Sequence, residues 1–109
     1  MIDDIECDEE FQTDVINKDG YVFVDFYADW CRPCKMMDST IEAADEELGD
    51  RMTFCRANVE TLKKTVDELD LMGIPAFLIY KDGEEIRRIT GYYPREHFID
   101  MINKCINIQ

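Results

Sequence analysis

Residues 21–35 read Tyr-Val-Phe-Val-Asp-Phe-Tyr-Ala-Asp-Trp-Cys-Arg-Pro-Cys-Lys, an apolar run followed by two cysteines three positions apart. The run over residues 21–27 has almost no polar alternation, which is typical of a central strand covered on both faces. Apolar residues then recur at helical spacing, at Met37, Ile41, Ala44 and Leu48. The stretch therefore predicts a buried strand that leads into a helix, with the two thiols at the junction.

The spacing of the two cysteines suits the formation and opening of a disulfide. Positions i and i+3 of a first helical turn share a face, so Cys31 and Cys34 can react with little else moving. Cys31 is expected at the helix N-terminus, where backbone N–H groups and the helix dipole favour an anion and lower the thiol pKa. Cys34 is then the resolving thiol. A lone C-x-x-C is a weak signal, since zinc sites and haem attachment share it.

Helices and strands alternate along the rest of the 109 residues, which we interpret as one domain over residues 1–109. Helices are expected at 8–17, 31–48, 60–71 and from Pro94, and strands at 21–27, 52–59, 76–81 and 85–90, with a hairpin turn at Asp82-Gly83. A first short edge strand within residues 1–7 is left open. This order predicts an α/β fold, in which a central mixed sheet of four to five strands is flanked by four helices.

The composition restricts the partners. The net charge is −13, which argues against binding to nucleic acid or to an anionic membrane surface. Residues 1–10 show no secretory signal, and apolar runs such as 76–80 are too short to span a bilayer. The chain has five cysteines and only one pair at a motif spacing, which suits a reducing compartment. A cytoplasmic monomer with no nucleic acid and no membrane partner is expected.

The chain resembles the thioredoxins from residue 11 to residue 106. The resemblance rests on Val-Asp-Phe-Tyr-Ala-Asp-Trp-Cys-Arg-Pro-Cys-Lys-Met at 24–36, on Gly-Ile-Pro-Ala-Phe-Leu-Ile-Tyr-Lys-Asp-Gly-Glu at 73–84, and on Gly91. It implies the thioredoxin fold and a protein-disulfide reductase that acts as an electron carrier. Disulfide-containing client proteins would be the substrates and a separate thioredoxin reductase the electron donor. No cofactor is implied beyond the redox-active pair Cys31 and Cys34, and no metal.

The resemblance places Asp25 behind Cys34, where the carboxylate takes the proton of that thiol directly or through water. A carboxyl inside an apolar strand is expected to be buried, and burial raises its pKa. A structural ion pair with Arg56 is the alternative role. Arg56 stands where the family usually has lysine, and arginine cannot lose its proton. A fixed cation beside Asp25 would hold that carboxylate ionised more strongly, so the size of the rise in pKa stays open.

The residues between the cysteines, Arg32 and Pro33, occupy the position that tunes the reduction potential in this superfamily. Thioredoxins commonly have glycine where Arg32 stands. A guanidinium beside Cys31 is expected to stabilise the thiolate and hence the reduced form. The alternative is an exposed arginine without measurable effect.

Two features concern the helix after the cysteines. Ser39 stands where thioredoxins have a helix-kinking proline, so we expect a smaller kink in this chain. The acidic residues of this helix are expected to face water, at Asp38, Glu42, Asp45 and Glu46.

The resemblance also implies a groove in which the client chain docks. Its expected lining is Trp30, Gly73, Ile74, Pro75, Gly91 and Tyr92. The Ile74–Pro75 bond is expected to be cis. Tyr92 stands where a small residue is common, so the groove would be narrower than usual.

Two other functions remain open at this point. An oxidant or isomerase with the same fold is disfavoured by the missing signal peptide and by the Cys-x-Pro-Cys pair. A non-catalytic structural subunit is disfavoured because Cys31, Cys34 and Asp25 are all present. A zinc site would need two further ligands, and no second C-x-x-C exists.

Overall fold

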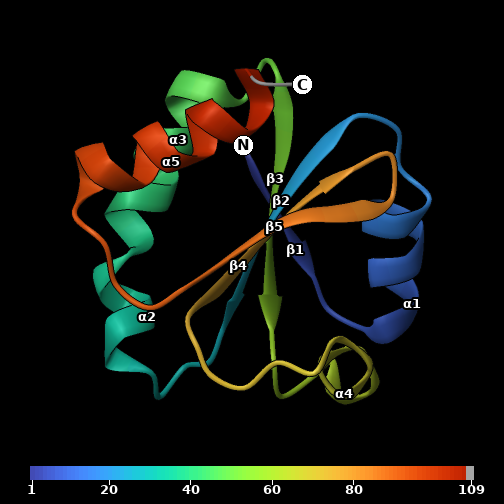
Figure 1. Cartoon of the computed structure of the whole chain (residues 1–109). Coiled ribbons are helices and arrows are strands. Elements are labelled where there is room, and N and C mark those ends of the chain that lie inside the picture. Colours follow the sequence, from blue (N-terminus) through green and yellow to red (C-terminus); the bar gives the residue numbers. More distant parts are fainter. Residues whose placement is uncertain (108–109) are drawn as a thin grey trace.

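The computed structural model describes residues 1–107, which form a five-stranded mixed sheet in the order β1-β3-β2-β4-β5 with helices on both faces (Figure 1). The strands are β1 (Ile2–Ile5), β2 (Tyr21–Tyr27), β3 (Met52–Asn58), β4 (Ala76–Lys81) and β5 (Glu84–Thr90). The helices are α1 (Asp8–Phe11), the π-helical turn η1 (Gln12–Ile16), α2 (Arg32–Met36), α3 (Asp38–Leu48), α4 (Lys63–Leu69) and α5 (Arg95–Asn107). The predicted α/β fold is confirmed, and the edge strand that was left open is present as β1.

Strand β2 lies at the centre of the sheet, parallel to β3 on one side and antiparallel to β4 on the other. The residues from Val22 to Phe26 are all buried, because both faces of the strand are covered. Asp25 is therefore in the middle of the sheet, and its register partner on β3 is Arg56. The central strand thus carries one charged side chain into the interior.

Helices α3 and α5 cover one face of the sheet, and α1 and α4 cover the other (Figure 1). On the α3–α5 face, Phe23, Phe77 and Phe98 form an aromatic group, with ring centroids of Phe77 and Phe98 4.8 Å apart. On the opposite face, the ring of Phe11 packs edge-on against Tyr80 at 5.9 Å. Both faces of the sheet are therefore covered by packed side chains.

The predicted single helix over residues 31–48 is wrong, because Met37 interrupts it between α2 and α3. Met37 has φ −88° and ψ −10°, and its N–H donates to the carbonyl of Cys34 in a tight turn. Its side chain is fully buried, and its sulfur accepts a hydrogen bond from the backbone N–H of Tyr93 at 3.5 Å. Ser39 is exposed. The break therefore occurs without a proline, at a residue held by packing.

Helix α4 is shorter than predicted, because it spans Lys63–Leu69 rather than residues 60–71. The residues before it form a turn around Asn58. The side chain of Asn58 accepts a hydrogen bond from the N–H of Glu60 at 2.9 Å, and its carbonyl accepts one from the N–H of Thr61 at 3.1 Å. Side chains of this kind compete with the first turn of a helix.

The hairpin turn between β4 and β5 is confirmed. Asp82 and Gly83 both adopt positive φ, at 51° and 85°, as a two-residue turn of this kind requires. Within residues 1–107, every helix is too short or too polar to cross a membrane.

Candidate functional site

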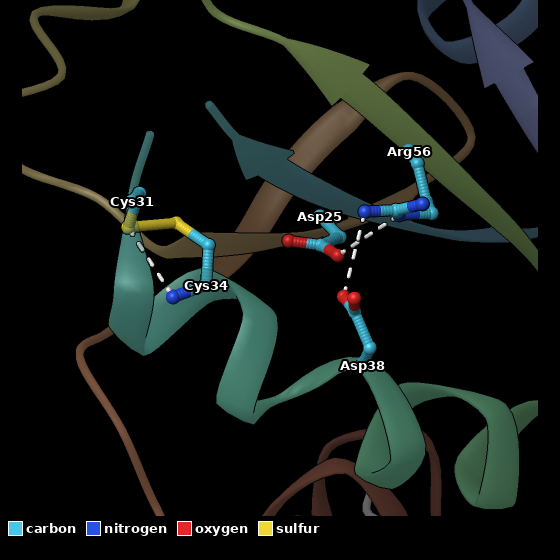
Figure 2. Close-up of a disulfide and its surroundings, with 5 residues drawn as sticks. All are labelled: Asp25, Cys31, Cys34, Asp38 and Arg56. Atoms are coloured by element: carbon cyan, nitrogen blue, oxygen red, sulfur yellow. Dashed lines mark hydrogen bonds and ion pairs between the residues drawn. A yellow bond between two sulfur atoms is a disulfide. The ribbon is translucent and has the colours of Figure 1, made fainter. Parts of the chain in front are cut away.

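Cys31 and Cys34 are joined by a disulfide at the start of α2, with their Cα atoms 5.3 Å apart (Figure 2). Cys31 is the N-cap residue, and its sulfur accepts a hydrogen bond from the backbone N–H of Cys34 at 3.2 Å. Pro33 lies in the first turn, where its missing N–H removes no helix bond. A backbone N–H directed at the sulfur of Cys31 stabilises negative charge on that atom once the disulfide opens.

The exposure of the side chains does not distinguish the two cysteines in the oxidised state. Cys31 is 4% and Cys34 is 3% exposed. They form a small apolar cluster with Ala28, against which Tyr27, Val59 and Ile74 pack. The difference between the two sulfurs is in their surroundings: Cys31 receives the N–H, and Cys34 borders a cavity.

Asp25 is 2% exposed on β2. In Figure 2 one carboxylate oxygen points toward Cys34, and the other pairs with Nε of Arg56 at 3.5 Å. Burial raises the pKa of Asp25 to about 7, although the cation of Arg56 acts in the opposite direction. The loss of hydration therefore outweighs the arginine, so this departure from the usual lysine leaves Asp25 able to titrate near neutral pH.

Arg56 is shared among three groups. Besides Asp25, its Nη2 lies 3.4 Å from Oδ1 of Asp38, and its guanidinium carbon lies 4.2 Å above the ring centroid of Tyr27. Asp38 faces water as expected, with its side chain 45% exposed, and it also pairs with Arg56. The same expectation is wrong for Asp45, whose side chain is 12% exposed and accepts a hydrogen bond from the N-terminal amino group at 2.7 Å. The spacing in the sequence could have placed Asp38 near the site, because Asp38 follows Cys34 by four residues, about one helical turn.

A cavity of about 160 Å³ connects Cys34 with this ion-pair cluster. Its lining consists of Tyr27, Ala28, Asp29, Cys34, Lys35, Asp38 and Arg56. A space of this size with polar walls can hold water. The cavity therefore brings Cys34, Asp38 and Arg56 to one space that is large enough for water, and its lining does not include Asp25.

The residues expected to line a docking groove are partly brought together. Ile74 packs against the disulfide cluster, and the Ile74–Pro75 bond is cis, as expected. The carbonyl of Pro75 accepts a hydrogen bond from the N–H of Gly91 at 2.9 Å. Gly91 has φ 90°, a conformation that favours glycine. Gly73 and Tyr92 are exposed.

Trp30 is 69% exposed beside the disulfide, and its indole N–H donates to the carboxylate of Glu60 at 3.2 Å. No pattern in the sequence had indicated Glu60, since the contact joins two loops 30 residues apart. Arg32, directly after Cys31, is exposed. Among residues 1–107, no group of three or more His, Cys, Asp or Glu side chains is arranged to hold a metal ion.

Comparisons with known proteins agree on one family. The family model described as Thioredoxin matches residues 4–104. The thioredoxin of Bacillus subtilis is 34% identical over 97 residues, covering 89% of this chain and 91% of that protein. The thioredoxin of Listeria monocytogenes is 38% identical over 88 residues, covering 81% of this chain and 85% of that protein. A solved thioredoxin structure from Malassezia sympodialis superimposes with a TM-score of 0.84 at 25% identity, covering 95% of this chain and 93% of that one.

Proposed function

Because the chain belongs to the thioredoxin family of disulfide oxidoreductases, we propose that it reduces disulfides of client proteins through Cys31 and Cys34. The observation that carries the proposal is the pair itself, closed as a disulfide at the N-terminus of α2 with the N–H of Cys34 directed at the sulfur of Cys31.

The reaction has two exchanges. The Cys31 thiolate attacks one sulfur of the client disulfide, forming a mixed disulfide and releasing the other client sulfur as a thiolate, which takes a proton from water. Cys34 then gives its proton to Asp25 and attacks the sulfur of Cys31, releasing the second client sulfur as a thiolate that takes a proton from water, and Asp25 returns its proton to the solvent. The client gains two electrons, and the pair Cys31 and Cys34 ends oxidised.

Asp25 is the proton acceptor in this proposal. Its burial supports the role, since a carboxylate with a pKa near 7 is partly ionised at neutral pH and basic enough to accept a proton. Arg56 tunes that carboxylate, while Arg32 and Pro33 tune the potential of the disulfide.

The client chain docks beside the disulfide. The exposure of Trp30 and the contact of Ile74 with the cysteine cluster support this placement. The full set of docking residues is Trp30, Gly73, Ile74, Pro75, Gly91 and Tyr92.

The proposal also covers the oligomeric state, the electron donor, the cellular compartment and the excluded partners. Residues 1–109 act as one domain and as a monomer, without a cofactor, and a thioredoxin reductase returns the electrons. Cys7, Cys55 and Cys105 are free thiols, which suits a reducing compartment such as the cytoplasm. The charge of −13 disfavours nucleic acid and anionic membranes as partners.

Insulin-disulfide reduction with dithiothreitol as the electron donor tests the function. The natural chain should accelerate the reaction, and Cys31→Ser should abolish the acceleration. Cys34→Ser should instead accumulate mixed disulfides with client proteins, because the second exchange is blocked. Turnover by Cys31→Ser would contradict the proposal. A measured reduction potential separates a reductant from an oxidant of the same fold.

A further inference from the structure

One cation faces two carboxylates at the edge of the site. Arg56 lies 3.5 Å from Asp25 through Nε and 3.4 Å from Asp38 through Nη2 (Figure 2). Both distances exceed the range of about 2.7–2.9 Å that is usual for tight charge-assisted hydrogen bonds. Arg56 therefore pairs loosely with both acids rather than closely with one.

The geometry of the guanidinium explains how Asp38 competes with Asp25 for its position. It is a rigid planar fork that grips a carboxylate best through two parallel hydrogen bonds. The side-on two-bond grip on Asp25 uses Nε and Nη2 together, and Nη2 also lies 3.4 Å from Oδ1 of Asp38. Because Nη2 carries two N–H groups, Asp38 competes for the position of the fork without excluding a contact with Asp25. The ring of Tyr27 under the guanidinium further restricts its plane.

Among the groups around Asp25, Arg56 is the one whose position most affects the charge balance at the carboxylate. On β4 its register partner is the apolar Phe77. On β1, Asp4 is the register partner of Arg56 and adds negative charge on that side. From α2 and its preceding loop, Lys35, Asp29 and Cys34 face the shared cavity. Arg56 is thus the cation that touches Asp25, and Asp38 is the group that draws it away.

We propose that Asp38 is a positioning residue, which holds Arg56 off a close grip on Asp25 and so leaves Asp25 able to accept the proton of Cys34. The inference rests on the proposed role of Asp25 in the second exchange. It explains how a permanent cation can stand beside Asp25 without disabling it as a base. Asp38 itself touches neither client nor sulfur in this proposal.

Asp38→Ala is the test variant, since it removes both the charge and the hydrogen-bond acceptor. Two readouts are measured: the titration of the Asp25 carboxyl by carbon NMR in the reduced protein, and the pH profile of the second exchange. For the latter, Cys31 is loaded with a chromogenic aromatic thiol as a mixed disulfide, and its release by Cys34 is followed by absorbance.

With Asp38 gone, Arg56 can close on Asp25. The Asp25 midpoint should fall by about 0.5–1 pH unit, since the carboxylate gains a cation and loses a like charge. The midpoint of the release profile should fall equally, and its plateau rate should drop about two- to threefold because the base is weaker. Asp38→Glu should restore both. Glu46→Ala, which removes an exposed carboxylate further along α3, should change neither. An unmoved or raised Asp25 midpoint in Asp38→Ala would overturn the proposal.

The same substitution in an Arg56→Met background separates positioning from a direct field effect. If Asp38 acts through Arg56, its removal there should shift the Asp25 midpoint by less than half as much. An equal shift in both backgrounds would show that Asp38 acts by its own charge, and the positioning role would be wrong. A shift in the Asp25 midpoint with no change in the release profile would instead refute the role of Asp25 in the second exchange.

Discussion

Asp25 of β2 and Arg56 of β3 are register partners in the parallel part of the sheet. Their side chains therefore leave the sheet on the same face, which is the face that carries α2 and α3. A slip of one residue would place them on opposite faces. The register of the two central strands thus fixes Asp25 and Arg56 as neighbours on one face of the sheet.

Replacing Asp25 by asparagine should stabilise the protein in a pH-dependent manner. The pKa of Asp25 is about 7 in the folded chain against an ordinary value of 3.8, so folding binds a proton between these values. The stability that this group contributes is complete below about pH 4 and is lost as the pH rises through 7, a difference of about 4 kcal/mol. Asp25→Asn removes that loss.

Guanidinium chloride unfolding of the oxidised proteins at pH 5.5 and pH 8 measures the effect. The gain from Asp25→Asn should be larger at pH 8 by about 2 kcal/mol. Asp29→Asn, at an exposed position, serves as the control. An equal gain at both pH values would mean that Asp25 does not titrate in the folded protein.

In the reduced protein, Cys31 should react with iodoacetamide much faster than Cys34 at neutral pH. The reason is the N–H of Cys34 that points at the sulfur of Cys31 and favours its thiolate. Mass spectrometry of partly labelled protein identifies the modified residue. Faster labelling of Cys34 would reverse the assigned order of the two thiols.

Arg32→Gly should raise the pKa of the Cys31 thiol and lower the reduction potential by roughly 10–20 mV, since the exposed cation next to the thiolate is lost. Arg32→Lys keeps the charge and should keep both values. The shifts should shrink at high salt, because exposed charges are screened. A thiol pKa that stays constant in glycine and lysine variants alike would show that Arg32 does not tune the thiolate.

Ser39→Pro should be tolerated, with a loss of stability below about 1 kcal/mol, because the helix is already interrupted at Met37 and Ser39 lies in the first turn of α3. Ala43→Pro, in the interior of the same helix, should cost about 3 kcal/mol or more. Thermal unfolding of both variants measures the difference. Similar losses in the two would mean that the backbone N–H of Ser39 holds α2 and α3 together.

Local patterns were enough to predict β2 and β4 to the residue, since residues 21–27 are apolar except for Asp25 and residues 76–80 are apolar throughout. The break at Met37 was not predictable in this way. It lies at a residue whose sulfur contacts the backbone of Tyr93, 56 residues further along the chain.

The functional site likewise combines residues that stand out in the sequence with residues that meet only in the folded protein. The cysteine pair and Asp25 stand out in the sequence, because the first has a motif spacing and the second interrupts an apolar strand. The pairing of Arg56 with Asp25 was expected and is present, but the contacts of Arg56 with Asp38 and Tyr27 were not, since these residues come from α3 and β2 and meet Arg56 only in the folded protein.

The interruption at Met37 also separates the short helix that carries Cys34 from the longer helix that packs in the core. Helix α3 buries Ile41, Ala44 and Leu48 in the core, whereas the only buried residue of α2 is Cys34. Substitutions between the cysteines therefore affect a short segment that carries little of the folding energy. If Arg32 and Pro33 set the potential as proposed, changes at these two positions should alter the strength of the reductant while the packing of α3 on the sheet stays the same.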